Sequence, residues 1–294
     1  LHSFPTRRSS DLYSSVVYNH LIPTIGDYRL QEVTSDVIQN YVKAKLSHHQ
    51  KALSSTTVRR HISILSSALK QAVKLGIIKV NPCIDVCIPA AKKRKMDVFS
   101  KEEYQKLEKT LYCDQDKVKA TAVLLALKTG VRLGELAALR WCDIDFEEKT
   151  MMVRDAVHRV NTSEDAGGKK TTMIFEGTKS YYSERNIPMN HEIYTLLKGY
   201  EAILSVKGEF VFLSKKGSFI DPRVYQTYFA DVLKNAGIKK RNFHILRHTF
   251  ATRAASKNMQ LAVLSRLLGH SNITVTLKSY IHPLTEQDRI EMNK

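Results

Sequence analysis

Cysteine is scarce in this sequence, with 4 residues in a chain of 294. Cys83 and Cys87 lie four positions apart, but no second pair of cysteines or histidines follows them at the spacing of a zinc site. So few cysteines in so long a chain exclude the disulfide framework of a small secreted domain. The sequence therefore predicts that Cys83, Cys87, Cys113 and Cys142 are buried, reduced thiols of a cytosolic protein.

Long apolar runs are also missing. The longest fully apolar stretches, such as residues 122–127, are far shorter than the roughly 20 residues that span a bilayer. No helix rich in Lys and Arg marks a membrane anchor. The sequence therefore gives little support to a protein that crosses or lies on a membrane.

Acidic residues are outnumbered. Asp and Glu total 29 against 46 Lys and Arg, which gives a formal net charge of +17 and a pI near 9.6. An excess of this size indicates a polyanionic partner, with nucleic acid first and an anionic membrane surface second. With 43% hydrophobic residues, the chain can bury one large core or, more in keeping with its length, two.

The amino end, LHSFPTRRSSDL over residues 1–12, has no initiator Met, no apolar signal-peptide core and no periodicity. It resembles the translation of a short-read sequencing adapter joined to a truncated reading frame. We therefore predict that residues 1–12 are not native and leave them out of the fold assignment. The alternative is a disordered basic arm. Under the adapter interpretation, the natural protein is longer at this end.

Residues 13–88 show a helical pattern throughout. One helix is expected to start with Thr34 or Ser35 as its N-cap. A second is expected over residues 54–75, with Gly76 as its stop signal. The second helix carries Arg59, Arg60, His61, Lys70 and Lys74 on its other faces. These residues form either an ordinary solvated face or one that contacts DNA, and the net charge supports the DNA interpretation.

A linker is predicted over residues 89–99, because Pro89 begins an extended segment and four consecutive cations follow. These are Lys92, Lys93, Arg94 and Lys95, a run that fits a tether lying against phosphates. The second domain, residues 100–294, opens at Ser100 with SKEE, a capping-box sequence.

The pattern within residues 100–294 is mainly helical. Residues 117–139 read as apolar helix, interrupted at Thr129 and Gly130. Residues 150–160, 172–178 and 184–189 read as short strands, and helical patterns return from about His191. The predicted fold class is therefore mainly α with a small β-sheet (α+β): a helical domain followed by a larger helical domain that holds the sheet.

Two short segments of this domain carry candidate chemical groups. In TGVRLGEL, Arg132 follows a helix-ending glycine and should lie near a helix N-terminus, which suits a phosphate. Glu135, three residues later, could pair with Arg132 or cap the helix. Lys179 lies in the predicted turn between two strands, where it is either solvated or able to reach a DNA groove or a reaction centre.

Two more segments lie nearer the end. HILRH places His244 and Arg247 on the same face of a helix. His244 and His248 also have the spacing of a zinc helix, but the Glu of the metalloprotease motif is replaced by Ile245, so a metal site is disfavoured. LGHSNITVTLKSYIHP holds His270 and Tyr280. A tyrosine becomes a nucleophile only beside groups that take its proton and neutralise the phosphate that it attacks; otherwise it is a packing residue.

In chain order these segments give Arg132, Lys179, His244-x-x-Arg247, His270 and Tyr280. This order and spacing resemble the tyrosine recombinase (phage integrase) family, and the neighbouring TGVRLGEL, LRHTFAT and LGHS segments match its boxes as well. The resemblance is close over residues 97–283. It is looser over residues 13–88, where the family has a helical SAM-like core-binding domain. Integrases of conjugative transposons and prophages are the most similar members, although the arm-binding module common among them is absent from this sequence.

The resemblance implies a site-specific integrase that cuts and rejoins DNA to integrate or excise a mobile element. Tyr280 would form a 3′-phosphotyrosine, and Arg132, Lys179, His244, Arg247 and His270 would complete the site, with no metal or nucleotide cofactor. The partners implied are double-stranded DNA at attachment sites, a homotetramer on DNA and an excision or directionality factor, in the bacterial cytoplasm with the nucleoid. Two alternatives stay open: a topoisomerase that relaxes DNA with the same residues, and a DNA-binding regulator with a silent site.

Overall fold

The computed structural model describes residues 13–47, 52–90, 97–161, 171–177, 184–270, 272–274 and 276–277. The predicted non-native segment 1–12 and the basic run Lys92–Lys95 lie outside the described residues, and so do Lys179 and Tyr280. The chain divides into two compact units at Arg94 and Lys95, with Val160–Lys170 counted with the first. They are called the amino-terminal and carboxy-terminal units below.

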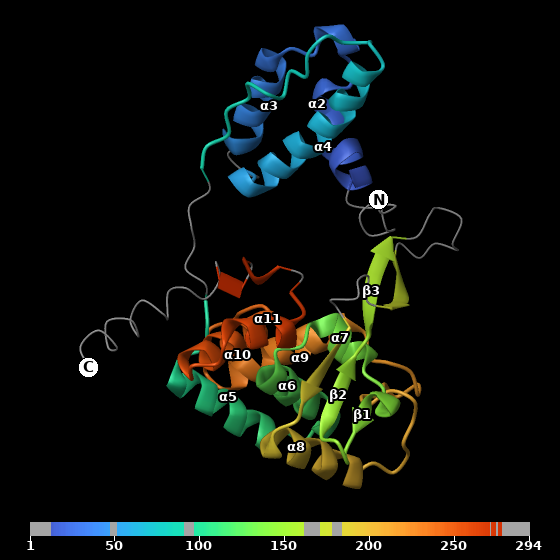
Figure 1. Ribbon diagram of the computed structural model, residues 1–294, viewed down its shortest axis with the longest axis vertical. Coiled ribbons are helices and arrows are strands. Elements are labelled where there is room, and N and C mark those ends of the chain that lie inside the picture. Colours follow the sequence, from blue (N-terminus) through green and yellow to red (C-terminus); the bar gives the residue numbers. More distant parts are fainter. Residues whose placement is uncertain are drawn as a thin grey trace, which may run out of the picture. The chain divides into compact units, whose positions relative to one another are not determined.

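The amino-terminal unit is helical (Figure 1). Thr34 caps its first long helix, with its hydroxyl 3.4 Å from the Val37 amide nitrogen. The other long helix has Ser54 as its N-cap and is followed by Gly76 in the left-handed conformation, with φ +71°. Apolar side chains from both form one core that includes Ile38, Val42, Val58 and Leu69. The elements are η1 (Val17–Leu21), α2 (Ile22–Ile25), η2 (Leu30–Glu32), α3 (Ser35–Ser47) and α4 (Ser55–Lys74).

One residue that the sequence placed on the basic face of α4 is instead in the core. His61 is only 2% exposed, and its Nδ1 lies 2.7 Å from the Tyr41 hydroxyl. Its ring also packs on that of His20, with centroids 4.7 Å apart. At 100° per residue, position 61 lies at the edge of the buried side of α4, next to Ala72, so its position on the helix rather than its polarity determined its burial.

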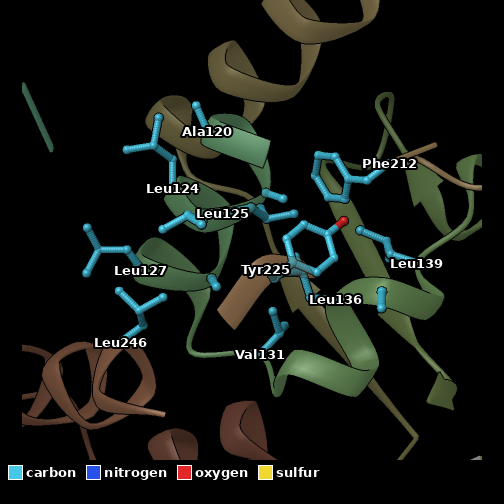
Figure 2. Packing of buried hydrophobic residues seen from close by; sticks show 14 of the residues in the cluster. Ala120, Leu124, Leu125, Leu127, Val131, Leu136, Leu139, Phe212, Tyr225 and Leu246 are labelled. Carbon is cyan, nitrogen blue, oxygen red and sulfur yellow. The ribbon is translucent and has the colours of Figure 1, made fainter. Parts of the chain in front are cut away.

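The carboxy-terminal unit is built around α6, which is buried along most of its length (Figure 1). Figure 2 shows the centre of its core, where Tyr225 lies among Leu125, Leu136 and Phe212. The predicted capping box is present, with the Ser100 hydroxyl accepting from the Glu103 amide. The helices are α5 (Lys101–Cys113), α6 (Lys117–Thr129), α7 (Leu133–Ala138), η3 (Trp141–Asp143), α8 (His191–Ala202), α9 (Pro222–Asn235), α10 (Ile245–Ser256) and α11 (Leu261–Leu268).

The strands form two small sheets, so the predicted fold class, mainly helical with a small β component, is confirmed. Three strands pair in the order β1-β2-β5, with Met151 opposite Ile187 and Val153 opposite Arg185. The other two pair as β3-β4. Their bounds are β1 (Ile144–Asp145), β2 (Thr150–Val153), β3 (Asp155–Asn161), β4 (Thr171–Gly177) and β5 (Arg185–Pro188).

The cysteine prediction needs a correction. All four are free, but only Cys83 is buried, whereas Cys87, Cys113 and Cys142 are exposed. Cys113 ends α5, Cys87 lies in a connection and Cys142 lies in the three-residue η3, so apolar periodicity gives no guide to the burial of any of them. Within the described parts of the chain, no helix combines the length and the apolar character needed to cross a membrane.

Candidate functional site in the carboxy-terminal unit

Arg132 stands at the junction of two helices. α6 ends at Gly130, which has φ +69°, and Arg132 is the N-cap of α7. A Cβ on Gly130 would come within 2.6 Å of the Phe250 ring, so both the backbone and the packing favour glycine here. Glu135 fills both roles foreseen for it: it accepts from the Arg132 backbone amide and from Nη1, each at 2.8 Å.

The start of α10 contributes His244 and Arg247. His244 is the N-cap residue, and Arg247 lies in the first turn, only 3% exposed. Arg247 donates from Nη1 to the Gly130 carbonyl at 2.9 Å and from Nη2 to the Leu268 carbonyl at 2.6 Å. Arg247 therefore connects the end of α6 to the end of α11. His244 lies beside it at the start of the same helix.

His270 follows the end of α11. The helix closes at Gly269, which has φ +64°, and Arg132 Nη2 donates to the Gly269 carbonyl at 3.1 Å. His270 Nδ1 lies 2.7 Å from the Thr276 hydroxyl, which orients the imidazole. The left-handed glycine thus turns the chain so that His270 comes out beside the carbonyls that the arginines hold.

Arg185, at the start of β5, is a component of this cluster that the sequence did not indicate as a site residue. Its guanidinium pairs with Glu135 through two nitrogens, at 2.7 and 3.2 Å, and both side chains are almost fully buried. Its Nε donates to the Leu267 carbonyl at 2.6 Å. A signal was present in the sequence. Arg185 and Ile187 are two residues apart in β5 and therefore point to the same, buried face, where a cation needs a partner.

The electrostatic environment keeps the histidines neutral and the carboxylate charged. Desolvation, with the positive charges of Arg247 and Arg132 among the further causes, lowers the pKa of both His244 and His270 to about 4. Burial alone would raise the pKa of Glu135, but hydrogen bonds and charge from Arg185, with Arg132, lower it to about 2. At neutral pH the site therefore presents guanidinium cations and uncharged imidazoles, a combination suited to a phosphate and to accepting a proton.

Four of the six predicted catalytic residues are thus brought together, namely Arg132, His244, Arg247 and His270. The other two, Lys179 and Tyr280, lie outside the described residues.

The predicted DNA-binding residues of α4 belong to the amino-terminal unit, and all four are exposed there. Arg59 also donates to the carbonyls of Ile88 and Pro89, at 3.4 and 3.2 Å. Arg60, Lys70 and Lys74 share the side of α4 opposite its buried residues.

The disfavoured metal interpretation can be compared with the geometry. His244 and His248 meet edge to face, with ring centroids 4.6 Å apart. Over the part of the chain that the structure describes, no three His, Cys, Asp or Glu side chains gather in a way that could hold a metal ion.

The fold and the site define a class of protein: a helical two-unit chain whose carboxy-terminal unit gathers arginines and neutral histidines suited to a phosphodiester. Comparison with protein families agrees. Residues 97–287 match the model of the phage integrase family, and residues 14–86 match the phage integrase SAM-like domain. The chain belongs to the phage integrase family, the tyrosine recombinases, whose members break and rejoin DNA strands.

Individual relatives support this assignment. A tyrosine recombinase XerC-like protein of Caldanaerobacter subterraneus subsp. tengcongensis is 31% identical, over 88% of this chain and 70% of the relative. In fold, the chain resembles the Tn1549 transposon integrase in complex with transposon right end DNA (TM-score 0.81, 22% identity, 99% of this chain and 95% of that one). It also resembles a lambda integrase tetramer bound to a Holliday junction (TM-score 0.68, 19% identity, 95% and 73%). These relatives favour neither the relaxing topoisomerase nor the silent regulator.

Proposed function

We propose that the chain is the site-specific integrase of a mobile element and that it acts through a 3′-phosphotyrosine intermediate on Tyr280. The observation that carries the proposal is the meeting of Arg132, His244, Arg247 and His270 from three separate chain segments around the end of α11. A regulator that only binds DNA has no use for two such arginines held beside two neutral histidines.

The proposed roles follow from the chemistry of each group. Arg132 and Arg247 bind the non-bridging oxygens of the scissile phosphate and stabilise the charge of the pentavalent transition state. The hydrogen bonds among the described residues use two of the five side-chain N–H donors of Arg132, so donors are left for a phosphate. His270 donates a further hydrogen bond to that phosphate.

Proton transfers complete the step. The Tyr280 oxygen attacks phosphorus as the bond to the 5′-oxygen breaks, and the proton of the phenol passes to His244. A pKa of about 4 keeps His244 unprotonated and able to accept. Lys179 gives a proton to the departing 5′-oxygen. Attack by a 5′-hydroxyl of the partner strand reverses these transfers and exchanges the strands without an external energy source.

The proposed assembly follows the family. Residues 13–88 and 100–294 would bind double-stranded DNA from opposite sides, joined by the linker 89–99. The family models match residues 14–86, before this linker, and residues 97–287, from its last residues onward. A homotetramer on DNA is supported by the lambda integrase tetramer on a Holliday junction. The attachment sites, an excision or directionality factor and action on bacterial nucleoid DNA in the cytoplasm belong to the same proposal.

The test is a covalent adduct. The protein is incubated with a labelled duplex that carries the direct repeat flanking its gene, nicked so that the released 5′-hydroxyl strand diffuses away. The unaltered chain should form an adduct that resists denaturation, and Tyr280→Phe should bind the same duplex with equal affinity and form none. An adduct with Tyr280→Phe, or none with the unaltered chain, would refute the proposal.

A further inference from the structure

Three successive carbonyls at the end of α11 each accept a hydrogen bond from a different arginine. The carbonyl of Leu267 accepts from Arg185 at 2.6 Å, that of Leu268 from Arg247 at 2.6 Å, and that of Gly269 from Arg132 at 3.1 Å. These are carbonyls that a helix end leaves without intrahelical partners and that carry the negative end of its dipole. The end of α11 therefore acts as a common attachment point for two proposed catalytic arginines and for Arg185.

Arg185 and Arg132 are also joined through one carboxylate. Each oxygen of Glu135 accepts one bond from each arginine: Oε1 from Nη1 of Arg132 (2.8 Å) and of Arg185 (3.2 Å), and Oε2 from the Arg132 amide (2.8 Å) and Arg185 Nη2 (2.7 Å). The side chains of Arg185 and Glu135 are 2% and 4% exposed, whereas that of Arg132 is 38% exposed. Arg185 thus lies behind Glu135, on the side away from solvent, and Arg132 lies in front of it.

We propose that Arg185 is a positioning residue for DNA cleavage, which holds Glu135 and the end of α11 in register and so fixes Arg132 and His270 before DNA binds. The inference rests on the proposed function. Arg185 has no proposed contact with the scissile phosphate, because its guanidinium donates hydrogen bonds to Glu135 and to the Leu267 carbonyl. It acts by limiting the positions that the Arg132 guanidinium can adopt.

The local sequence fits this role. The planar guanidinium binds a carboxylate through two parallel hydrogen bonds and still offers Nε to a carbonyl, whereas a lysine ammonium is a single point charge without that fixed geometry. Gly269 is matched to the same side chain, since a Cβ there would lie 2.9 Å from Arg185 Nη1. The glycine that turns the chain toward His270 therefore also leaves room for Arg185.

A positioning role can be separated from a purely structural one. Removing one partner of a buried ion pair leaves an unpaired charge and destabilises the fold, whereas neutralising both partners together can leave stability nearly unchanged. We therefore compare Arg185→Gln and Glu135→Gln with the double variant, in which stability is expected to recover. Arg185→Lys keeps the charge but loses the paired hydrogen bonds. Lys128→Met is the matched control, because Lys128 is also a buried cation of this unit, paired with Glu108 and Glu192.

The measurements are thermal melting, affinity for the nicked duplex and the single-turnover rate of adduct formation. The double variant should melt close to the unaltered protein and bind the duplex normally, yet cleave roughly 100-fold more slowly, the size expected for a misplacement of about 1 Å. Arg185→Lys should also cleave slowly, and Lys128→Met should lower melting without slowing cleavage at a temperature where it is folded. A double variant that melts normally and cleaves within about threefold of the unaltered protein would overturn the proposal.

Amide hydrogen exchange tests the anchor without any cleavage. The amides of Gly269 and His270 donate to Arg266 and Ser265 at the end of α11. Their exchange should quicken in the double variant and stay unchanged in Lys128→Met. If the unaltered chain forms no adduct, the proposed function fails, yet this comparison still decides whether Arg185 holds the end of α11. Equal exchange in the double variant and the unaltered chain would overturn that role.

Discussion

The two units use their cations in opposite ways. On α4 of the amino-terminal unit, Arg59, Arg60, Lys70 and Lys74 are exposed, and the last three share the side opposite the core. In the carboxy-terminal unit, Arg185 and Arg247 are buried and donate to backbone carbonyls, and Arg185 also pairs with Glu135. The net charge of the sequence gives no hint of this division, because it counts both groups alike.

The difference indicates what each group can do. An exposed, hydrated cation contributes modestly to contact with phosphate, and salt screens that contribution. A guanidinium that folding has already oriented needs no further ordering when the substrate arrives, so its interaction can be concentrated on the transition state. We therefore expect the α4 cations to govern affinity and the buried arginines to govern rate.

The largest expected effect is that of Arg247→Ala. The variant should bind the nicked duplex almost normally and form adduct at least about 1000-fold more slowly, because a preoriented donor to the transition state is lost. Single-turnover cleavage at saturating DNA measures this. Lys128→Met is again the control for the loss of a buried cation. A large loss of affinity with a normal cleavage rate would erase the contrast between the two units.

The Lys179→Ala variant sharpens the contrast inside the site, between charge stabilisation and proton donation. If Lys179 is the general acid, its loss should slow cleavage by roughly 100-fold or more on ordinary DNA. A duplex with sulfur at the 5′-bridging position should restore the rate, because a thiolate leaves without protonation. Arg132→Ala should not be restored, since its task concerns the non-bridging oxygens. Lys169 and Lys170 precede Lys179 in the chain and serve as controls. Rescue of Lys169→Ala or Lys170→Ala in place of Lys179→Ala would show that another lysine is the acid.

The same contrast explains how far the sequence could be read. Local signals were sufficient for Arg132 and Glu135, because the glycine stop, the helix start and the pairing partner all lie within six residues. Arg185 escaped notice because its partners, Glu135 and Leu267, are 50 and 82 residues away, and no pattern within a strand reveals them. His61 was placed on the exposed face because it is polar, although its position borders the buried side of α4. The sequence therefore predicts fold class and helix ends well, but buried polar partners poorly.

A third prediction concerns the histidines, whose lowered pKa values should have different consequences in the two units. Burial, with the nearby His20 and Lys45, lowers the pKa of His61 to about 4, against an ordinary value of 6.5. The unfolded chain therefore binds a proton at a higher pH than the folded chain does. The resulting stability is complete above pH 6.5 and is lost as the pH falls toward 4, by an amount on the order of 3 kcal/mol.

Tryptophan fluorescence would report on the other unit, because the single tryptophan, Trp141, lies there. Amide exchange of α3 and α4 in the full chain is therefore used to measure this loss. Between pH 7 and pH 5, after correction for intrinsic exchange, the protection of these helices should fall in the unaltered protein and stay level in His61→Gln. His191→Gln, at an exposed position, should behave like the unaltered protein. Cleavage in the same interval should not fall through protonation of His244 or His270, whose pKa values are also about 4.

The smallest expected effect belongs to the exposed cations, and it is the one that defines their role. Each phosphate contact that is lost should lower the slope of log affinity against log salt by about 0.9 on B-DNA. Replacing Arg60, Lys70 and Lys74 with Gln should therefore weaken binding only several-fold at moderate salt and flatten the slope. Cleavage at saturating DNA should be unchanged. Replacing Lys101, Lys106 and Lys109 with Gln, all three exposed on α5, provides the matched loss of charge elsewhere. If the α4 and α5 variants flatten the slope equally, net charge alone determines affinity and α4 is not a DNA-contacting face.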